Sequence, residues 1–120
     1  MMPAPGQKND CGVYTPHETL ELPMPRKGWR GMPLADIDLV QTPEGWRSCF
    51  GYQFMTGDCC GRGSPLTDHD RAFPTRELAV SHSATALRKI AARRADREAK
   101  LVLEWLDNLE PVQADLFALL

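Results

Sequence analysis

The tetrapeptide Thr42-Pro43-Glu44-Gly45 separates two runs of alternating residues, and it constrains the fold of this 120-residue chain more than any other feature. Proline presets the backbone angle at the second position of a turn, and glycine accepts a positive φ at the fourth. Before the turn, Ile37 and Leu39 alternate with aspartates, as in a strand with one buried and one solvated face. We therefore predict an antiparallel hairpin with its turn at residues 42–45.

The second strand of this hairpin spans residues 46–54 and is rich in aromatic side chains. Because successive side chains of a strand point to opposite faces, four of them share one face, which we expect to form the floor of the core: Trp46, Phe50, Tyr52 and Phe54. The glycine-rich residues 57–65 are predicted to form a loop. A short extended piece at residues 71–73 would then complete a meander of about three strands.

Two helices are predicted after the sheet. Thr75 is a plausible N-cap, and apolar residues recur at three- and four-residue spacing over residues 80–91 and again over residues 101–109. One continuous helix would place Arg94 and Glu98 on the apolar stripe, which is costly without polar partners. We therefore predict a break near Ala95-Asp96, with Asp96 capping the second helix.

The fold class that follows is α+β: a small antiparallel β-meander of about three strands, packed by a helix and followed by a second, C-terminal helix. Residues 1–33 hold six of the ten prolines and are predicted to form an N-terminal arm. Within this arm, residues 18–22 alternate and favour a short edge strand. The core domain is expected over residues 34–110, and residues 111–120 are expected to form a tail or a short helix.

The composition narrows the classes of function. A net charge of -2 gives no global attraction to nucleic acid or to anionic membranes. No apolar run approaches the roughly 18 residues that span a bilayer, and the first residues lack the charged-then-apolar order of a secretory signal. We therefore expect a cytoplasmic protein.

Metal binding and catalysis find little support in the sequence. Cys11, Cys49, Cys59 and Cys60 are an even set that could form disulfides in a secreted protein, but without a secretory signal free thiols are expected. Zinc with His69 as a further ligand is the competing interpretation, but the spacing of Cys49, Cys59 and Cys60 matches no usual pattern of paired ligands, so no cofactor is expected. Acidic residues and His69 surround the glycine-rich loop, but no nucleophile, base and orienting group occur at a catalytic spacing. We expect that the protein is not an enzyme.

One charged surface is a candidate binding site for nucleic acid or for an acidic protein. If the helix runs on, four cations fall within one narrow sector opposite the apolar stripe: Lys89, Arg93, Arg97 and Lys100. The alternative is a solvated face whose charges form Asp96–Lys100 and Arg94–Glu98 pairs at four-residue spacing.

The most specific short motif is Gln113-Ala114-Asp115-Leu116-Phe117. It resembles the pentapeptide with which bacterial replication and repair proteins dock on the DNA sliding clamp, and it departs from that pattern only in its small second residue. The resemblance implies that Leu116 and Phe117 fill an apolar pocket and that Gln113 makes polar contacts, and Asp115 is the fourth predicted partner-binding residue. The alternative is that this segment forms a last helical turn packed on the core.

A wider resemblance covers about residues 35–117. The runs Gly45-Trp46-Arg47-Ser48, Gly63-Ser64-Pro65-Leu66 and Phe73-Pro74-Thr75-Arg76-Glu77, followed by the pentapeptide, look like small proteins of bacterial plasmids and integrative elements, also found beside ParB-like partition proteins. This resemblance implies an accessory adaptor of mobile DNA that binds a replication or partition partner. Two alternatives are a small DNA-binding module and an inhibitor of a host defence complex, encoded by a mobile element.

Overall fold

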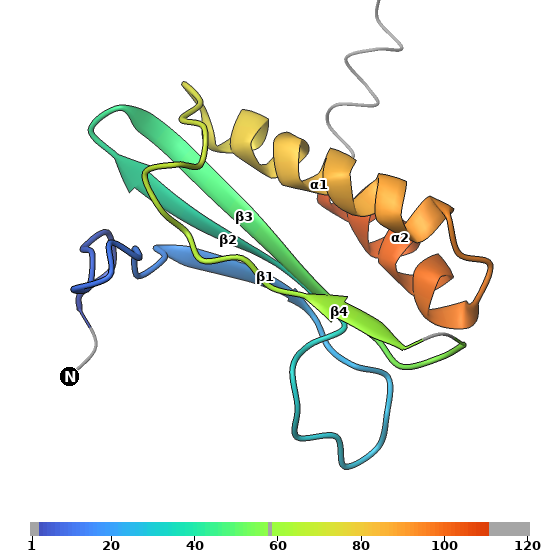
Figure 1. Cartoon of the computed structure of the whole chain (residues 1–120). Coiled ribbons are helices and arrows are strands. Elements are labelled where there is room, and N and C mark those ends of the chain that lie inside the picture. The colour runs from blue at the N-terminus through green and yellow to red at the C-terminus, as the bar shows by residue number, and fades with distance from the viewer. Residues whose placement is uncertain (1–2, 58, 111–120) are drawn as a thin grey trace, which may run out of the picture.

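The centre of the molecule is an antiparallel sheet of four strands in the order β1-β2-β3-β4, seen in a computed structural model that describes residues 3–57 and 59–110 (Figure 1). The strands are β1 (Glu18–Leu22), β2 (Ala35–Thr42), β3 (Gly45–Phe54) and β4 (Cys60–Arg62). Sequential strands are neighbours throughout, so the meander predicted from the sequence is confirmed, with one strand more than expected.

The hairpin between β2 and β3 has the predicted turn. Thr42 and Gly45 face each other across the ladder, which leaves Pro43 and Glu44 as the two loop residues. Gly45 has a φ of +136°, a conformation that residues with a Cβ rarely adopt. The alternation of β2 therefore places Ala35, Ile37 and Leu39 on the core face of the sheet.

Two details of the sheet differ from the sequence prediction. The segment predicted as a glycine-rich loop contains β4, because β3 continues as far as Phe54 and gives Cys60, Gly61 and Arg62 antiparallel partners. The strand expected at residues 71–73 is reduced to an isolated bridge between Trp46 and Phe73, and Pro74 directly after it has no N–H to extend the ladder. The edge strand predicted at residues 18–22 is confirmed as β1.

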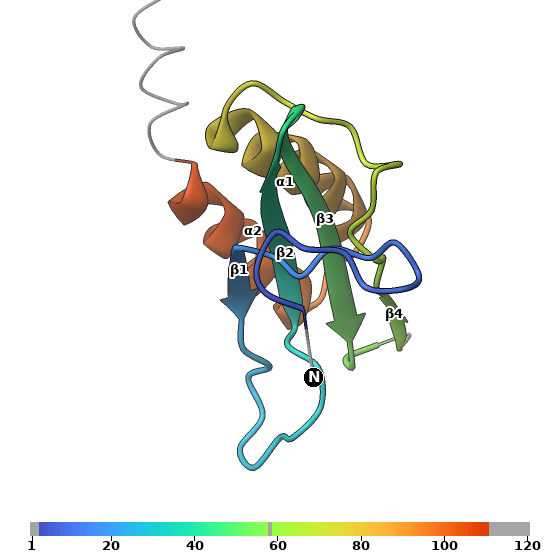
Figure 2. The ribbon, with the colours of Figure 1, turned by 90° about the vertical axis from the view of Figure 1, so that its left-hand side faces the viewer.

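Both helices lie on the same side of the sheet (Figures 1 and 2). Helix α1 (Arg76–Ala92) begins after the predicted N-cap, since Thr75 Oγ1 accepts a hydrogen bond from Leu78 N at 3.2 Å. It crosses β2 and β3, and Ser48 of β3 donates a hydrogen bond to the carbonyl of Ala79 at 2.7 Å. Helix α2 (Arg97–Leu109) packs against α1, and Asp96 caps it, as predicted.

The core lies between the sheet and the helix layer. Phe54 is buried in this core and Trp46, Phe50 and Tyr52 pack against it, as predicted, while Leu34, Leu87 and Leu106 are fully buried beside them. The segment predicted as an arm also contributes, because Met24 is buried in the same cluster and Leu20 and Leu22 pack against it. All described members of this core lie between Leu20 and Leu109.

The other face of the sheet is covered only in part by the N-terminal segment, which crosses it at one end (Figure 2). There Tyr14 joins Val40, Cys49 and Leu66 in a second, smaller cluster. Tyr14 donates a short hydrogen bond to Asp68, which also pairs with Lys8 at 2.8 Å. The arm is therefore fixed to the sheet by specific contacts.

Candidate functional site

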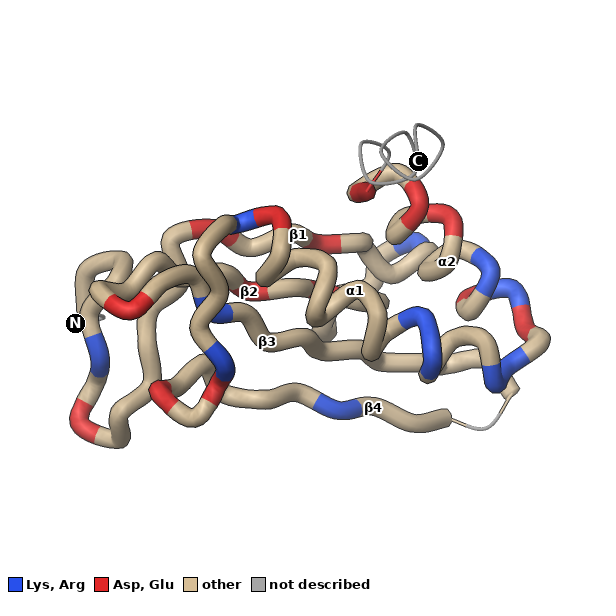
Figure 3. Tube along the Cα trace, turned by 90° about the horizontal axis from the view of Figure 1, so that it is seen from above, with Lys and Arg blue, Asp and Glu red and all other residues tan. Residues whose placement is uncertain are grey.

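The four cations predicted as a binding surface all lie where α1 and α2 meet, and all are exposed. Lys89 is in the last turn of α1, Arg93 is its C-cap, and Arg97 and Lys100 are in the first turn of α2. Figure 3 shows Lys and Arg gathered at this end of the helix pair. We call these four residues the basic turn.

The helix break changes the shape of this surface. A stripe along one continuous helix is excluded, because α1 ends at Ala92 and α2 begins at Arg97. The break lies at the predicted position and the predicted cap is present: Asp96 Oδ1 accepts a hydrogen bond from Ala99 N at 2.9 Å, which fixes the start of a new helix. The cations therefore form a compact group at the end of a helical hairpin.

The acidic residues near the basic turn have other partners. Asp96 pairs with Arg94 at 2.7 Å and not with Lys100. The hydrogen bond from Ala99 N, together with Arg94, holds the pKa of Asp96 below its ordinary value of 3.8. Within residues 3–57 and 59–110, none of the four cations of the basic turn takes part in an ion pair. No carboxylate of the described residues therefore neutralises these four charges.

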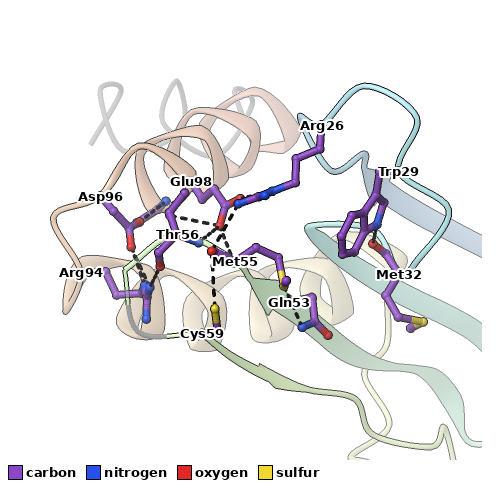
Figure 4. Close-up of polar contacts among 11 residues, drawn as sticks. Arg26, Trp29, Met32, Gln53, Met55, Thr56, Cys59, Arg94, Asp96 and Glu98 are labelled. Atoms are coloured by element: carbon purple, nitrogen blue, oxygen red, sulfur yellow. Dashed lines mark hydrogen bonds and ion pairs between the residues drawn. The ribbon is translucent and has the colours of Figure 1, made fainter.

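Glu98, which the sequence placed on the apolar stripe, is buried with only 2% of its side chain exposed. Its Oε1 accepts hydrogen bonds from Met55 N at 2.6 Å, from Thr56 N at 2.9 Å and from Thr56 Oγ1 at 3.1 Å (Figure 4). Arg26 Nε lies 3.8 Å from its other oxygen. The buried carboxylate therefore holds the end of β3 against the start of α2.

Arg94 makes a second link between the same two parts of the molecule. Its guanidinium lies 4.5 Å from the ring centroid of Phe54, and its Nη2 donates to Thr56 O at 2.6 Å. Its Nη1 lies 3.5 Å from Cys60 Sγ in β4. The segment between α1 and α2 is thus fixed to the end of the sheet by charged groups, which gives the basic turn a defined position.

On the face of the sheet away from the helices, β2 carries Asp36 and Asp38. Asp36 stands directly opposite Glu21 on one side and Gly51 on the other. Burial, together with the charges of Asp38 and Glu21, raises the pKa of Asp36 above its ordinary value of 3.8. Asp36 and Asp38 were not predicted as a candidate site from the sequence, although their Asp-x-Asp alternation on one strand would have indicated that they share a face.

Cys49 is buried beside this acidic group. Burial is the main cause that raises the pKa of its thiol to about 12, and the charges of Asp38, Asp70 and Asp36 add to it. All four cysteines are free thiols in the structure. In the part of the chain that the structure describes, no three His, Cys, Asp or Glu residues lie together in a way that would hold a metal ion.

The acidic residues around the loop at 67–70 have structural roles. Asp68 accepts hydrogen bonds from Lys8 and Tyr14, which hold its pKa below the ordinary value of 3.8. Asp70 accepts from Thr67 N at 2.9 Å, as in a turn, and its carbonyl accepts from the buried Arg47. These contacts link the N-terminal segment, β3 and the loop before α1.

The predicted partner-binding residues Gln113, Asp115, Leu116 and Phe117 lie outside the described residues. No family model, curated protein or solved structure matches this chain. The resemblance to proteins of bacterial plasmids therefore stays a prediction. None of the helices in the described ranges is long and apolar enough to cross a membrane.

Proposed function

We propose that this chain is a non-enzymatic adaptor of bacterial mobile DNA, which acts in the cytoplasm and docks on a protein partner through residues 113–117. The observation that carries the proposal is the pentapeptide, which has the pattern of a sliding-clamp ligand at four of five positions. A short segment with two large apolar anchors is a common way to bind a preformed groove.

The end of α2, which closely precedes residues 113–117 in the chain, is held in place by ion pairs, and this supports the proposed role. Arg88 of α1 pairs with Asp107 and, at 3.4 Å, with Glu110, the residue that follows α2. Glu110 is largely covered, with 11% of its side chain exposed. The pentapeptide therefore begins three residues after a position that is fixed to the helix layer.

The proposal is tested by measuring binding of the purified sliding clamp to the full chain and to a peptide of residues 109–120. We expect both to bind, with a Kd in the micromolar range. Phe117→Ala should weaken binding by about 30-fold or more, because an anchor in a pocket typically contributes 2 kcal/mol or more. Leu119→Ala, outside the pentapeptide, is the matched control and should bind as the unchanged chain does.

Two results would contradict the proposal. The first is no binding of the full chain at a clamp concentration of about 100 µM, where any ligand with a micromolar Kd would be saturated. The second is equal loss of affinity in Phe117→Ala and Leu119→Ala, which would indicate a nonspecific apolar contact.

A second candidate function is binding of nucleic acid through the basic turn, and the finding that its four cations form no ion pair within the described residues favours it. Each phosphate contact releases counterions, so four contacts predict a slope of about −3.6 in a plot of log K against log salt concentration. Arg93→Glu/Arg97→Glu should abolish binding to a short duplex. Binding with a flat salt dependence, or binding that survives this change, would exclude the basic turn.

A further inference from the structure

The face of the sheet away from the helices carries a groove of about 320 Å³ that the N-terminal segment leaves open. Met32 and Pro33 line one side, Asp36 and Asp38 rise from β2, and Gly61 of β4 lies on the other side. Its volume is at the lower end of the range for ligand sites, about 300–1,000 Å³. It has room for a few side chains of a partner.

Two glycines of the groove leave space that polar side chains of neighbouring residues fill. Gly51 lies between Asp36 and β4, and a Cβ at Gly51 would stand 2.8 Å from Asp36 Oδ1. A Cβ at Gly61 would stand 2.9 Å from Gln53 Oε1. The polar side chains of the neighbouring residues therefore occupy the space above the glycines, and the carboxylate of Asp36 reaches into the groove.

Two carboxylates, those of Asp36 and Asp38, and one cation, Arg62 of β4, line the groove, and among the described residues Arg62 forms no ion pair with either carboxylate. Glu21 lies beside the groove on β1. Glu21 and Asp36 are directly opposite each other on β1 and β2, where two like charges disfavour one another. Asp38 accepts a hydrogen bond from the neutral Thr19 Oγ1 at 2.7 Å. A cation placed here would remove the repulsion among the three carboxylates.

The basic turn is a complementary surface on the same molecule, but it cannot reach its own groove. It belongs to the helix layer, and both helices lie on the opposite side of the sheet (Figure 1). Guanidinium groups suit carboxylates because the two make paired, parallel hydrogen bonds. A second copy of the chain thus offers cations with paired donors to the carboxylates of Asp36, Asp38 and Glu21.

We propose that the acidic groove of one copy receives the basic turn of a second copy, in a head-to-tail contact. The two surfaces are different and lie on different layers of the molecule, so this contact is heterologous and leaves a free groove and a free basic turn at the two ends of each dimer. Further copies add in the same way. The contact is charged and small, so the association is weak and sensitive to salt.

The test is sedimentation of the full chain over a range of concentrations, at about 50 mM and about 500 mM salt, where the screening length differs about threefold. At low salt we expect the weight-average mass to rise with concentration beyond that of a dimer. At high salt the monomer mass should return. A chain that stays monomeric at low salt and millimolar concentration would overturn the proposal.

Charge reversal then identifies the two surfaces. Glu21→Lys/Asp36→Lys and Arg93→Glu/Arg97→Glu should each be monomeric alone, since each opposes like charges. An equal mixture of the two variants should associate again, because the reversed groove of one variant, now positive, meets the reversed basic turn of the other, now negative, and the two unreversed surfaces are also of opposite sign. A mixture that stays monomeric, or association that survives in either variant alone, would refute the contact.

Two controls keep the result interpretable. Asp10→Lys/Glu104→Lys makes the same change of net charge as the groove variant, but at exposed positions outside both surfaces, and it should associate as the unchanged chain does. Should the lysine variant of the groove fail to fold, Glu21→Gln/Asp36→Asn keeps the side-chain shapes and should still reduce association at least tenfold. The groove variants should retain any binding of nucleic acid or of the sliding clamp, because they leave the basic turn and residues 113–117 unchanged. The head-to-tail contact can therefore be refuted without refuting either proposed function.

Discussion

The buried carboxylate of Glu98 accepts a hydrogen bond from the backbone N–H of Thr56 at 2.9 Å, although the two residues are 42 positions apart. This contact joins the start of α2 to the end of β3, and Met55 N donates to the same oxygen. The polar group satisfies backbone donors that would otherwise be buried without a partner.

Glu98→Gln should therefore destabilise the fold by about 1–3 kcal/mol, because the three hydrogen bonds to Oε1 lose their charge assistance and an amide NH₂ replaces the oxygen that faces the Arg26 guanidinium. Urea unfolding at neutral pH measures the effect. Glu104→Gln, on the exposed side of the same helix, is the control and should change the free energy of unfolding by less than about 0.5 kcal/mol. Equal effects of the two changes would show that the Glu98 contacts contribute little.

Gly45→Ala should destabilise the chain by about 1–3 kcal/mol, since the residue has a positive φ and a Cβ would stand 2.5 Å from the carbonyl oxygen of Phe73. The comparison is Gly63→Ala, where a Cβ would meet no atom within 4 Å. Thermal unfolding of both variants tests this. If both melt at the same temperature, the bridge between Trp46 and Phe73 is not rigid.

Asp36→Asn should stabilise the fold at pH 7 by about 0.2–1 kcal/mol, the usual size of a cross-strand like-charge effect. The folded-state pKa of Asp36 is raised above 3.8, so its contribution to stability is present below that pH and is lost as the pH rises through the folded pKa. The gain should shrink at high salt. Loss of stability in Asp36→Asn, with Asp10→Asn unchanged, would contradict this account.

The thiol of Cys49 should resist modification in the folded protein. Cys11, Cys59 and Cys60 are exposed, whereas Cys49 is buried and its pKa is raised to about 12, so a thiol reagent at pH 8 should label three cysteines in the native chain and four in denaturant. Mass spectrometry counts the labels. Rapid labelling of Cys49 in the native chain would show that the cluster around Tyr14 opens readily.

The same raised pKa makes stability depend on pH in the alkaline range. An ordinary thiol titrates near 9, so the contribution of neutral Cys49 is complete below that pH and is lost progressively between about 9 and 12. Cys49→Ala should lack this part of the alkaline loss. Cys11→Ala, at an exposed position, should keep it.

Local features of the fold were predictable because their causes are local. Pro43 and Gly45 identify the turn, and Thr75 and Asp96 each supply the side-chain oxygen that caps a helix within three residues. Strand β4 was missed since Gly61 has little intrinsic preference for a strand, and only its pairing with Gln53 defines it.

The candidate surfaces depended on contacts between distant segments and could be predicted only in part. The four cations were identified from their spacing. That they form no ion pair within the described residues follows from two other contacts: Asp96 pairs with Arg94, and Glu98 is buried. The groove required the register that sets Asp36 beside Gly51, together with Met32 from a loop. Helical spacing carries no information on such pairings.

The N-terminal segment also has a practical consequence for anyone who shortens this protein. Tyr14 covers Val40, Cys49 and Leu66, and none of these three belongs to the main core. A truncated chain that begins at Glu18 would keep the main core and the helix layer, but it would leave an apolar strip on the sheet open to water. Such a product is expected to express as a folded protein and to aggregate on concentration.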